Sequence, residues 1–196
     1  MKLESYWKGR WEKALYGGQY SEKEVAEFVK ETMKLSEDTT LLDVGCGGGV
    51  LLKNLPAKKK TGLDYSKGRI HEAQKNVPEA TFDQGDADAL PYPDDSFDRV
   101  LSHSTFMYYT RPYAEKALRE LERVCNTGGT VMVGDVEDIE QYPGGRWIYE
   151  LRTRLLKTLG RGHYTALSRR FFQERGYSIV PSPFNKRFYA IKTKAD

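Results

Sequence analysis

The sequence predicts an α/β domain with a doubly wound, mostly parallel sheet of seven strands that ends in an antiparallel hairpin. Between residues 40 and 134, short apolar runs alternate with helical segments, as in consecutive parallel βαβ units. Near the C-terminus, two further strand-like runs are separated only by the turn-like segment PSPFNK, which favours an antiparallel pair.

Each element has its own local signal. Ser21 followed by Glu24 is a capping-box pattern, which predicts a helix start. The helices are expected at 3–15, 22–35, 49–54, 67–76 and 112–125, and two more helical segments at 147–159 and 167–175. The short apolar runs of a buried sheet predict strands at 40–44, 61–63, 80–83, 99–102 and 130–134, and the hairpin strands at 177–180 and 188–192.

Composition narrows the class of protein. A chain of 196 residues with 39% hydrophobic and 30% charged residues is typical of one globular domain. No apolar run approaches the roughly 18–20 residues of a membrane span, and the N-terminal segment lacks the apolar stretch of a secretory signal. Two cysteines exclude a disulfide framework and a cysteine zinc cluster, so a reduced, cytoplasmic protein is expected.

Charge is distributed unevenly along the chain. From Arg146 onward there are 12 Lys and Arg against 3 Asp and Glu, a net +9, whereas the whole chain carries +3. Such a basic third suits an anionic partner such as a phosphate or a nucleic acid. A solvated face of basic helices explains the same residues.

The sharpest motif is Asp43-Val-Gly45-Cys-Gly47-Gly48-Gly49, which stands between a predicted strand and a predicted helix. Glycines there allow a tight turn and a close approach of a ligand to the backbone. The dinucleotide pattern G-x-G-x-x-G would need a glycine where Val50 stands, and the Gly-Lys-Ser/Thr of a phosphate-binding loop is absent. The two commonest nucleotide-binding motifs therefore fit poorly.

With LLDVGCGGG, TGLDYS, GDADALPYPDDSFDRVLS and GGTVMVGDV in this order, the chain resembles the class I S-adenosylmethionine-dependent methyltransferases, in particular the small-molecule branch called methyltransferase type 11. The resemblance runs over residues 41–135. It implies a Rossmann-like fold in one domain, with an N-terminal helical cap at 1–38, a cofactor-binding core at 39–135, and substrate-side helices with the hairpin at 136–196. It implies S-adenosylmethionine as cofactor and S-adenosylhomocysteine as product.

The resemblance also assigns roles to residues. The Gly45–Gly49 backbone would lie against the methionine part of the cofactor, with Asp43 anchoring the loop. Asp64 would accept hydrogen bonds from the ribose hydroxyls, Asp86 would accept from the adenine amine, and Ser102 would face the methionine amine or carboxylate. The full cofactor set implied is Asp43, Gly45, Cys46, Gly47, Gly49, Asp64, Tyr65, Ser66, Asp86, Ala87 and Ser102.

Methyl transfer needs alignment of the reactants, and a hydroxyl acceptor gains from a nearby base. His103, at the carboxyl end of the fourth predicted strand, is the candidate general base, although a packed loop histidine would look the same in sequence. Candidate substrate-binding residues are Tyr6, Trp11, Tyr108, Tyr109, His163 and Arg169. The acidic run from Asp135 to Glu140 invites a metal site, but a solvated loop explains it equally well, and no metal is expected.

The expected function is methyl transfer to a small, possibly anionic acceptor, with oxygen favoured over nitrogen or carbon. Two alternatives stay open: an RNA methyltransferase that uses the basic C-terminal third, and a non-catalytic partner subunit that binds the cofactor. Against RNA, the Asn/Asp-Pro-Pro-Tyr/Phe signature of base-amine methyltransferases is absent, and SHSTFMYY stands there. No membrane partner is expected, and both a monomer and a homodimer remain open.

Overall fold

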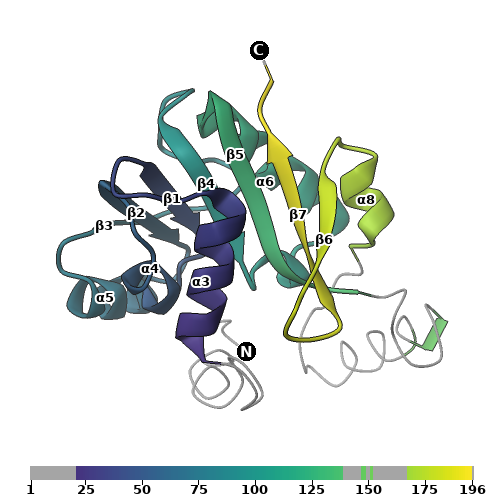
Figure 1. Ribbon diagram of the computed structural model, residues 1–196, viewed down its shortest axis with the longest axis horizontal. Coiled ribbons are helices and arrows are strands. Elements are labelled where there is room, and N and C mark those ends of the chain that lie inside the picture. The colour runs from purple at the N-terminus through teal and green to yellow at the C-terminus, as the bar shows by residue number, and fades with distance from the viewer. Residues whose placement is uncertain (1–20, 139–146, 149–150, 152–166, 196) are drawn as a thin grey trace.

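The computed structural model describes residues 21–138, 147–148, 151 and 167–195. Its centre is one seven-stranded sheet with the order β3-β2-β1-β4-β5-β7-β6 (Figure 1). β7 pairs antiparallel with both β5 and β6, and the other neighbours are parallel. The predicted doubly wound sheet with a C-terminal antiparallel hairpin is therefore confirmed.

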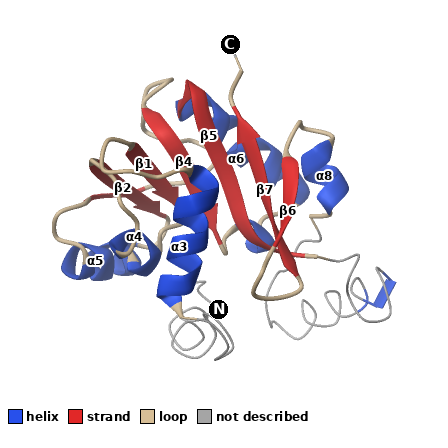
Figure 2. Cartoon of the chain, in the orientation of Figure 1, coloured by secondary structure: helices blue, strands red, loops and turns tan. Residues whose placement is uncertain are grey.

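The elements lie close to their predicted places (Figure 2). The strands are β1 (Thr40–Val44), β2 (Lys59–Asp64), β3 (Thr81–Gln84), β4 (Phe97–His103), β5 (Cys125–Glu137), β6 (Ser178–Pro181) and β7 (Arg187–Thr193). The helices are α3 (Glu22–Met33), α4 (Val50–Lys53), α5 (Lys67–Asn76), the 3-10 turn η1 (Phe106–Tyr108), α6 (Arg111–Val124) and α8 (Arg169–Gln173). The expected helix 3–15 lies outside the described residues, as does most of 147–159.

α3 begins where the capping-box pattern predicted. The Glu24 amide donates to the Ser21 hydroxyl over 3.3 Å, and the Ser21 amide donates to the Glu24 carboxylate over 2.8 Å. Both contacts use backbone amides that the first helical turn leaves without partners, so the pair stabilises the helix start.

β5 is much longer than the run at 130–134 suggested. Cys125 already has extended backbone angles, so the chain passes from α6 into β5 without a loop. The early part of the strand, TGG at 127–129, carries no apolar pattern. Its backbone is held by the segment after β7: the Gly128 amide donates to the Lys194 carbonyl and the Lys194 amide donates to the Gly129 carbonyl, both over 2.9 Å. Strand propensity therefore did not predict this segment, because hydrogen bonds to neighbouring backbone keep it in the sheet.

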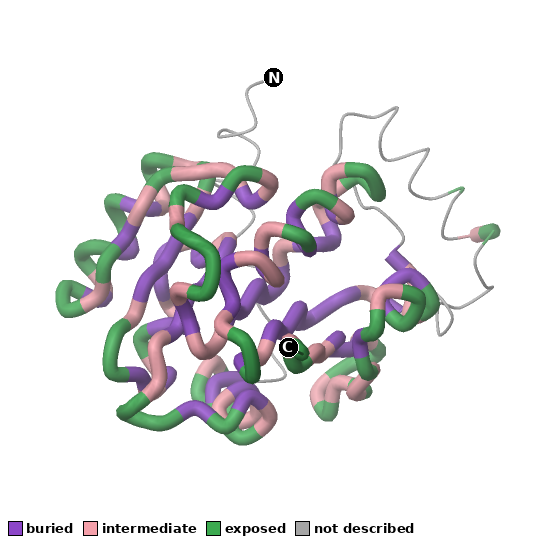
Figure 3. The backbone as a smooth tube through the Cα atoms, turned by 90° about the horizontal axis from the view of Figure 1, so that it is seen from above, coloured by how far each residue is buried: buried purple, intermediate pink, exposed green. Residues whose placement is uncertain are grey.

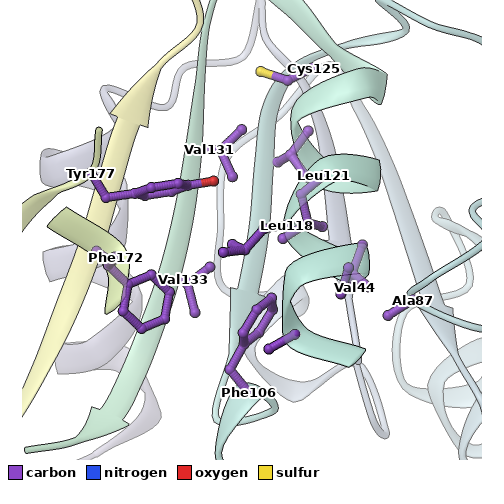
Figure 4. Packing of buried hydrophobic residues seen from close by; sticks show 14 of the residues in the cluster. Val44, Ala87, Phe106, Leu118, Leu121, Cys125, Val131, Val133, Phe172 and Tyr177 are labelled. Carbon is purple, nitrogen blue, oxygen red and sulfur yellow. The ribbon is translucent and has the colours of Figure 1, made fainter. Parts of the chain in front are cut away.

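Alternating side chains divide the core into two layers, one on each face of the sheet. α6 and α8 cover the face that carries Val100 and Val133, and Figure 4 shows this packing. α3, α4 and α5 cover the face that carries Leu101 and Met132. The buried sheet runs between the exposed outer surfaces of the helices (Figure 3). None of the described helices is long and apolar enough to cross a bilayer.

Gly62 of β2 is a packing requirement. A Cβ built there would lie 2.6 Å from the Phe82 ring and 2.8 Å from the Cys46 sulfur. We expect Gly62→Ala to destabilise the fold by about 1–3 kcal/mol, because the neighbours must move.

Denaturant unfolding checks this, with Gly68→Ala as the matched control. Gly68 is an exposed helical residue whose new Cβ would meet only the Ser66 hydroxyl, at 3.8 Å. That substitution should be neutral or stabilise α5 by about 0.5–1 kcal/mol. Equal stability of the two variants would contradict the packing argument.

Candidate active site

The glycine loop leaves β1 at its carboxyl end and leads into α4. Gly45, Gly47 and Gly49 have φ angles of 79°, 54° and 74°, a region that side-chain-bearing residues rarely adopt. A Cβ at Gly45 would also lie 2.4 Å from the Thr105 hydroxyl oxygen. The Gly45 and Cys46 amides both donate to the Leu63 carbonyl, at 2.7 and 3.1 Å, which fixes the loop against β2.

Asp64, the last residue of β2, holds the middle of this loop. Its carboxylate accepts from the Gly47 amide and from the Ser66 amide, both over 2.9 Å. Burial raises the pKa of Asp64, while these two amides act to lower it. The anchoring role that the resemblance gave to Asp43 is thus carried by Asp64 in the structure.

Asp43 is buried in β1 with 2% exposure, and its Oδ1 atom has no hydrogen-bond partner. Burial, followed by the nearby Asp64 carboxylate, raises the pKa of Asp43 to about 7. A buried carboxylate without a partner is costly to ionise. The pair formed by Asp43 and Asp64 therefore favours a cationic ligand at the end of β1.

The neighbouring loops contribute further residues of the implied set. The Tyr65 ring is 69% exposed, and the Ser66 hydroxyl accepts from the Arg69 amide as the N-cap of α5. Asp86 accepts a hydrogen bond from the Tyr113 hydroxyl of α6, while Ala87 packs in the core.

Cys46 is buried, and burial is the first cause of a raised pKa for its thiol. A neutral, buried thiol is a poor nucleophile. Cys46 is therefore a small packing residue of the loop.

Ser102 does not face the loop as expected. It is fully buried, and its hydroxyl donates to the Val44 carbonyl over 2.8 Å. Strand alternation turns this side chain toward the core, so the hydroxyl links β4 to β1. We therefore leave Ser102 out of the ligand-binding set.

His103 is buried on the opposite face of β4, with 9% exposure. Its Nε2 lies 3.4 Å from the Tyr189 hydroxyl, and its Nδ1 lies 3.1 Å from the Ser104 hydroxyl. Burial is the largest influence on the pKa of His103 and lowers it, so the ring is neutral near pH 7; Asp135 acts to raise that pKa and Arg187 to lower it.

Two partners of this histidine, Ser104 and Tyr189, and the Asp135 carboxylate bonded to Ser104 were not predicted from the sequence. Ser104 adjoins His103 in the sequence, but its contact with Asp135, 31 residues away, depends on the pairing of β4 with β5. Tyr189 comes from the hairpin strand β7. In the sequence, Asp135 stands out only as part of an acidic run. Among the described residues, no cluster of three or more His, Cys, Asp or Glu side chains could hold a metal.

The candidate substrate residues have different outcomes. Tyr6, Trp11 and His163 lie outside the described residues. Tyr108 and Tyr109 are half-buried beside η1, and burial raises the pKa of Tyr109. Their position at the carboxyl end of β4 is compatible with a substrate contact.

Arg169 is paired with the buried carboxylate of Asp138 over 2.5 Å. A guanidinium that is paired with a buried carboxylate stays in that ion pair, because separating the two would leave the buried Asp138 charge unpaired. The expected role of Arg169 in substrate binding therefore loses its basis.

Many basic residues of the C-terminal part are likewise paired within the chain. In five of six such ion pairs, the acidic partner lies between residues 95 and 138. The pairs are Arg169–Asp138, Arg170–Glu174, Arg175–Glu115, Arg187–Asp135, Lys192–Glu122 and Lys194–Asp95. Within the part of the chain that the structure describes, these pairs compensate much of the positive charge of the C-terminal part.

Comparison with known proteins agrees with this geometry. Residues 42–133 match the family described as a methyltransferase domain. An uncharacterised methyltransferase of Anoxybacillus flavithermus is 24% identical over 191 residues, which cover 92% of this chain and 90% of the relative. A fatty-acid O-methyltransferase of Mycolicibacterium smegmatis is 34% identical over 105 residues, 50% of this chain and only 38% of that relative.

The fold also has solved counterparts. The crystal structure of a putative S-adenosylmethionine-dependent methyltransferase from Methanococcus maripaludis superposes with a TM-score of 0.64 at 21% identity, covering 94% of this chain and 89% of that one. The family match, the glycine loop and the sheet order agree. Together they support a class I S-adenosylmethionine-dependent methyltransferase.

Proposed function

We propose that the protein transfers a methyl group from S-adenosylmethionine to the oxygen of a small-molecule acceptor at the carboxyl ends of β1, β2 and β4. The observation that carries the proposal is the buried Asp43 carboxylate, which lies beside Asp64 under a glycine loop and has an oxygen without a partner. In open α/β sheets, ligands bind at this edge of the sheet.

The residues present fit this cofactor. S-adenosylmethionine carries a positive sulfonium and a positive ammonium group, and two neighbouring carboxylates attract such charges. No atom lies within 4 Å of a Cβ built at Gly47, so the loop leaves space for a ligand against its backbone. We assign the methionine part to the Gly45–Gly49 loop on this basis.

The nucleoside part fits the neighbouring loops. The Asp64 carboxylate, which ends β2, is assigned to the ribose hydroxyls, and the exposed ring of Tyr65 supplies an apolar surface for adenine. Asp86 is assigned to the adenine amine, since a carboxylate accepts more than the one hydrogen bond that Tyr113 gives it.

When bound, the cofactor supplies an electrophilic methyl group on a sulfonium. The chain must then orient the acceptor, exclude water and receive the proton of its hydroxyl. His103 is the assigned base, because it is neutral and lies at the carboxyl end of β4. The similarity to a fatty-acid O-methyltransferase supports oxygen as the acceptor atom, although this chain covers only 38% of that relative.

An RNA acceptor is the weaker alternative. Most of the basic side chains that the structure describes beyond residue 166 are engaged in ion pairs, such as Arg175–Glu115 and Lys192–Glu122. Phosphate binding would have to compete with these pairs.

Asp64→Ala is expected to weaken S-adenosylmethionine binding by about 1–3 kcal/mol, roughly 5- to 150-fold in Kd. The substitution removes the ribose acceptor and also the anchor of the Gly47 amide. Isothermal titration calorimetry measures the change. Asp83→Ala, in which an aspartate of the adjacent strand β3 is lost, is the control and should bind normally. Unchanged affinity of the Asp64 variant would remove Asp64 from the ribose site.

The proposed function is tested by titrating the protein with S-adenosylmethionine, S-adenosylhomocysteine and NAD in parallel, then screening acceptors with methyl-labelled cofactor. We expect micromolar binding of both sulfur compounds, no binding of NAD, and label in a hydroxylated small molecule. Label recovered in RNA would favour the alternative acceptor. Binding without transfer to any acceptor class would favour the non-catalytic partner subunit.

A further inference from the structure

A continuous set of polar contacts connects the hairpin to His103. The Arg187 guanidinium donates to Asp135, and the Ser104 hydroxyl donates to the same carboxylate oxygen over 2.6 Å. The Ser104 oxygen then lies 3.1 Å from His103 Nδ1, and Nε2 on the other side of the ring lies 3.4 Å from the Tyr189 hydroxyl. Asn185 adds a further contact to Asp135, over 3.3 Å.

The backbone is strained where these contacts form. Ser104 and Asp135 both have positive φ angles, 56° and 60°, a region that side-chain-bearing residues rarely adopt. The register between β5 and β7 also breaks between Val133 and Val136, beside Asp135. Such strain persists only where surrounding contacts hold it, and it is concentrated at functional sites.

Gly134 makes room for the histidine. A Cβ at this position would lie 2.7 Å from the Tyr189 ring and 2.8 Å from His103 Cδ2. The Tyr189 and His103 rings therefore pack directly against the backbone of Gly134, which has no side chain. The His103 ring has little space to rotate, so the directions in which its two nitrogens point are fixed.

The position of the proton on the His103 ring follows from the hydrogen-bond donors around it. Asp135 is paired with Arg187 and is an acceptor only. Ser104 has a single hydroxyl proton, and the short bond to Asp135 uses it. Toward His103, Ser104 can offer only a lone pair. Nδ1 must therefore carry the proton, and the neutral ring has its lone pair on Nε2.

We propose that Ser104 and Asp135 are positioning residues that hold His103 in the Nδ1–H tautomer, so that Nε2 is the proton acceptor in methyl transfer. The inference rests on the proposed function for the role of His103 as base. The acceptor hydroxyl takes the place of the Tyr189 hydroxyl at Nε2 and gives its proton there. Its oxygen keeps the electron pair that forms the bond to the methyl carbon, and the methyl–sulfur bond breaks with its electron pair left on the sulfur of S-adenosylhomocysteine. The resulting imidazolium donates from Nδ1 to Ser104, which remains bonded to the Asp135 carboxylate.

The tautomer can be read directly by ring ¹⁵N NMR on the protein alone. The chain has 3 histidines, so His103→Gln assigns the signals. In the unsubstituted protein we expect a protonated Nδ1 and an unprotonated Nε2 for His103. The opposite tautomer would overturn the proposal.

Ser104→Gly removes the hydroxyl, and its φ of 56° suits glycine, so the fold should be kept. We expect loss of the Nδ1–H tautomer in this variant. Tyr189→Phe is the matched control: it removes the contact to Nε2 and should leave Nδ1 protonated. An unchanged tautomer in Ser104→Gly, or a changed one in Tyr189→Phe, would overturn the assignment to Ser104.

The two proposals fail in different ways. The tautomer is measured without cofactor or acceptor, so it does not depend on methyl transfer. If the NMR result holds while His103→Gln transfers methyl groups at the normal rate, the base role fails and the positioning contact stands.

Discussion

Replacing His103 with alanine is expected to lower the turnover number for methyl transfer by roughly 10²–10⁴-fold, with the affinity for S-adenosylmethionine unchanged. The substitution removes the neutral imidazole that we assign as proton acceptor at the carboxyl end of β4. The cofactor contacts assigned to Asp64 and the glycine loop involve other strands, so binding should persist.

The measurement combines turnover with calorimetry on the same preparation. His71→Ala is the matched control, because His71 is an exposed residue on α5 and should keep normal turnover. Thermal unfolding of His103→Ala separates loss of the base from loss of folded protein. Turnover within a few-fold of the unsubstituted enzyme would reduce His103 to a packing residue.

The second large effect concerns Asp43 and the pH dependence of stability. Folding raises the pKa of this carboxyl from 3.8 to about 7, so between these pH values the native state binds more protons than the unfolded state. The contribution of Asp43 to the free energy of unfolding should therefore fall as pH rises from about 4 to about 7. The full penalty at neutral pH is at most about 4 kcal/mol.

Asp43→Asn should remove this penalty, because an amide does not ionise. We expect the variant without cofactor to be more stable than the unsubstituted protein at pH 8, and to lack the decline between pH 4 and 7. Denaturant unfolding across this pH range tests both points. Asn cannot attract a cationic ligand as a carboxylate does, so the same variant should bind S-adenosylmethionine more weakly.

Asp98→Asn is the control, because folding lowers the pKa of Asp98 and raises that of Asp43. Asp98 accepts from the Thr40 amide over 2.8 Å, and this hydrogen bond is the first cause of its lowered pKa. Its contribution to stability is present above the unfolded pKa and is lost as pH falls through the lower folded pKa. The Asn variant should therefore be destabilised at neutral pH. Equal pH profiles for the two variants would contradict the special environment of Asp43.

Local signals in the sequence predicted most of the architecture. Strand β1 could be recognised because TLLDV is a short apolar run followed by glycines, and parallel strands buried on both faces require such runs. Ser21 and Glu24 marked the helix start because both residues of that contact lie within one helical turn. The order of motifs also identified the family, which the comparisons confirm.

The sequence could not show the orientation or the partners of single side chains. Ser102 and His103 are neighbours in β4, yet one turns into the core below α6 and the other toward Tyr189. Strand register decides which of the two side chains lies on which face of the sheet, and a register shift of one residue would exchange the faces of Ser102 and His103. The length of β5 was likewise decided by its pairing, with β4 at Cys125 and with β7 at Val136 and Glu137.

The sequence by itself determined the places of most strands and helices of a doubly wound α/β fold and the glycine loop with Asp43 and Asp64, because those features depend on local patterns and spacing. Only the tertiary structure joined Ser104 to Asp135 and Arg169 to Asp138, since these contacts connect residues 31 positions apart or separate elements of the chain. The physical reason is that burial, strand register and charge pairing are properties of the packed chain, and they decide which side chains remain available to a ligand.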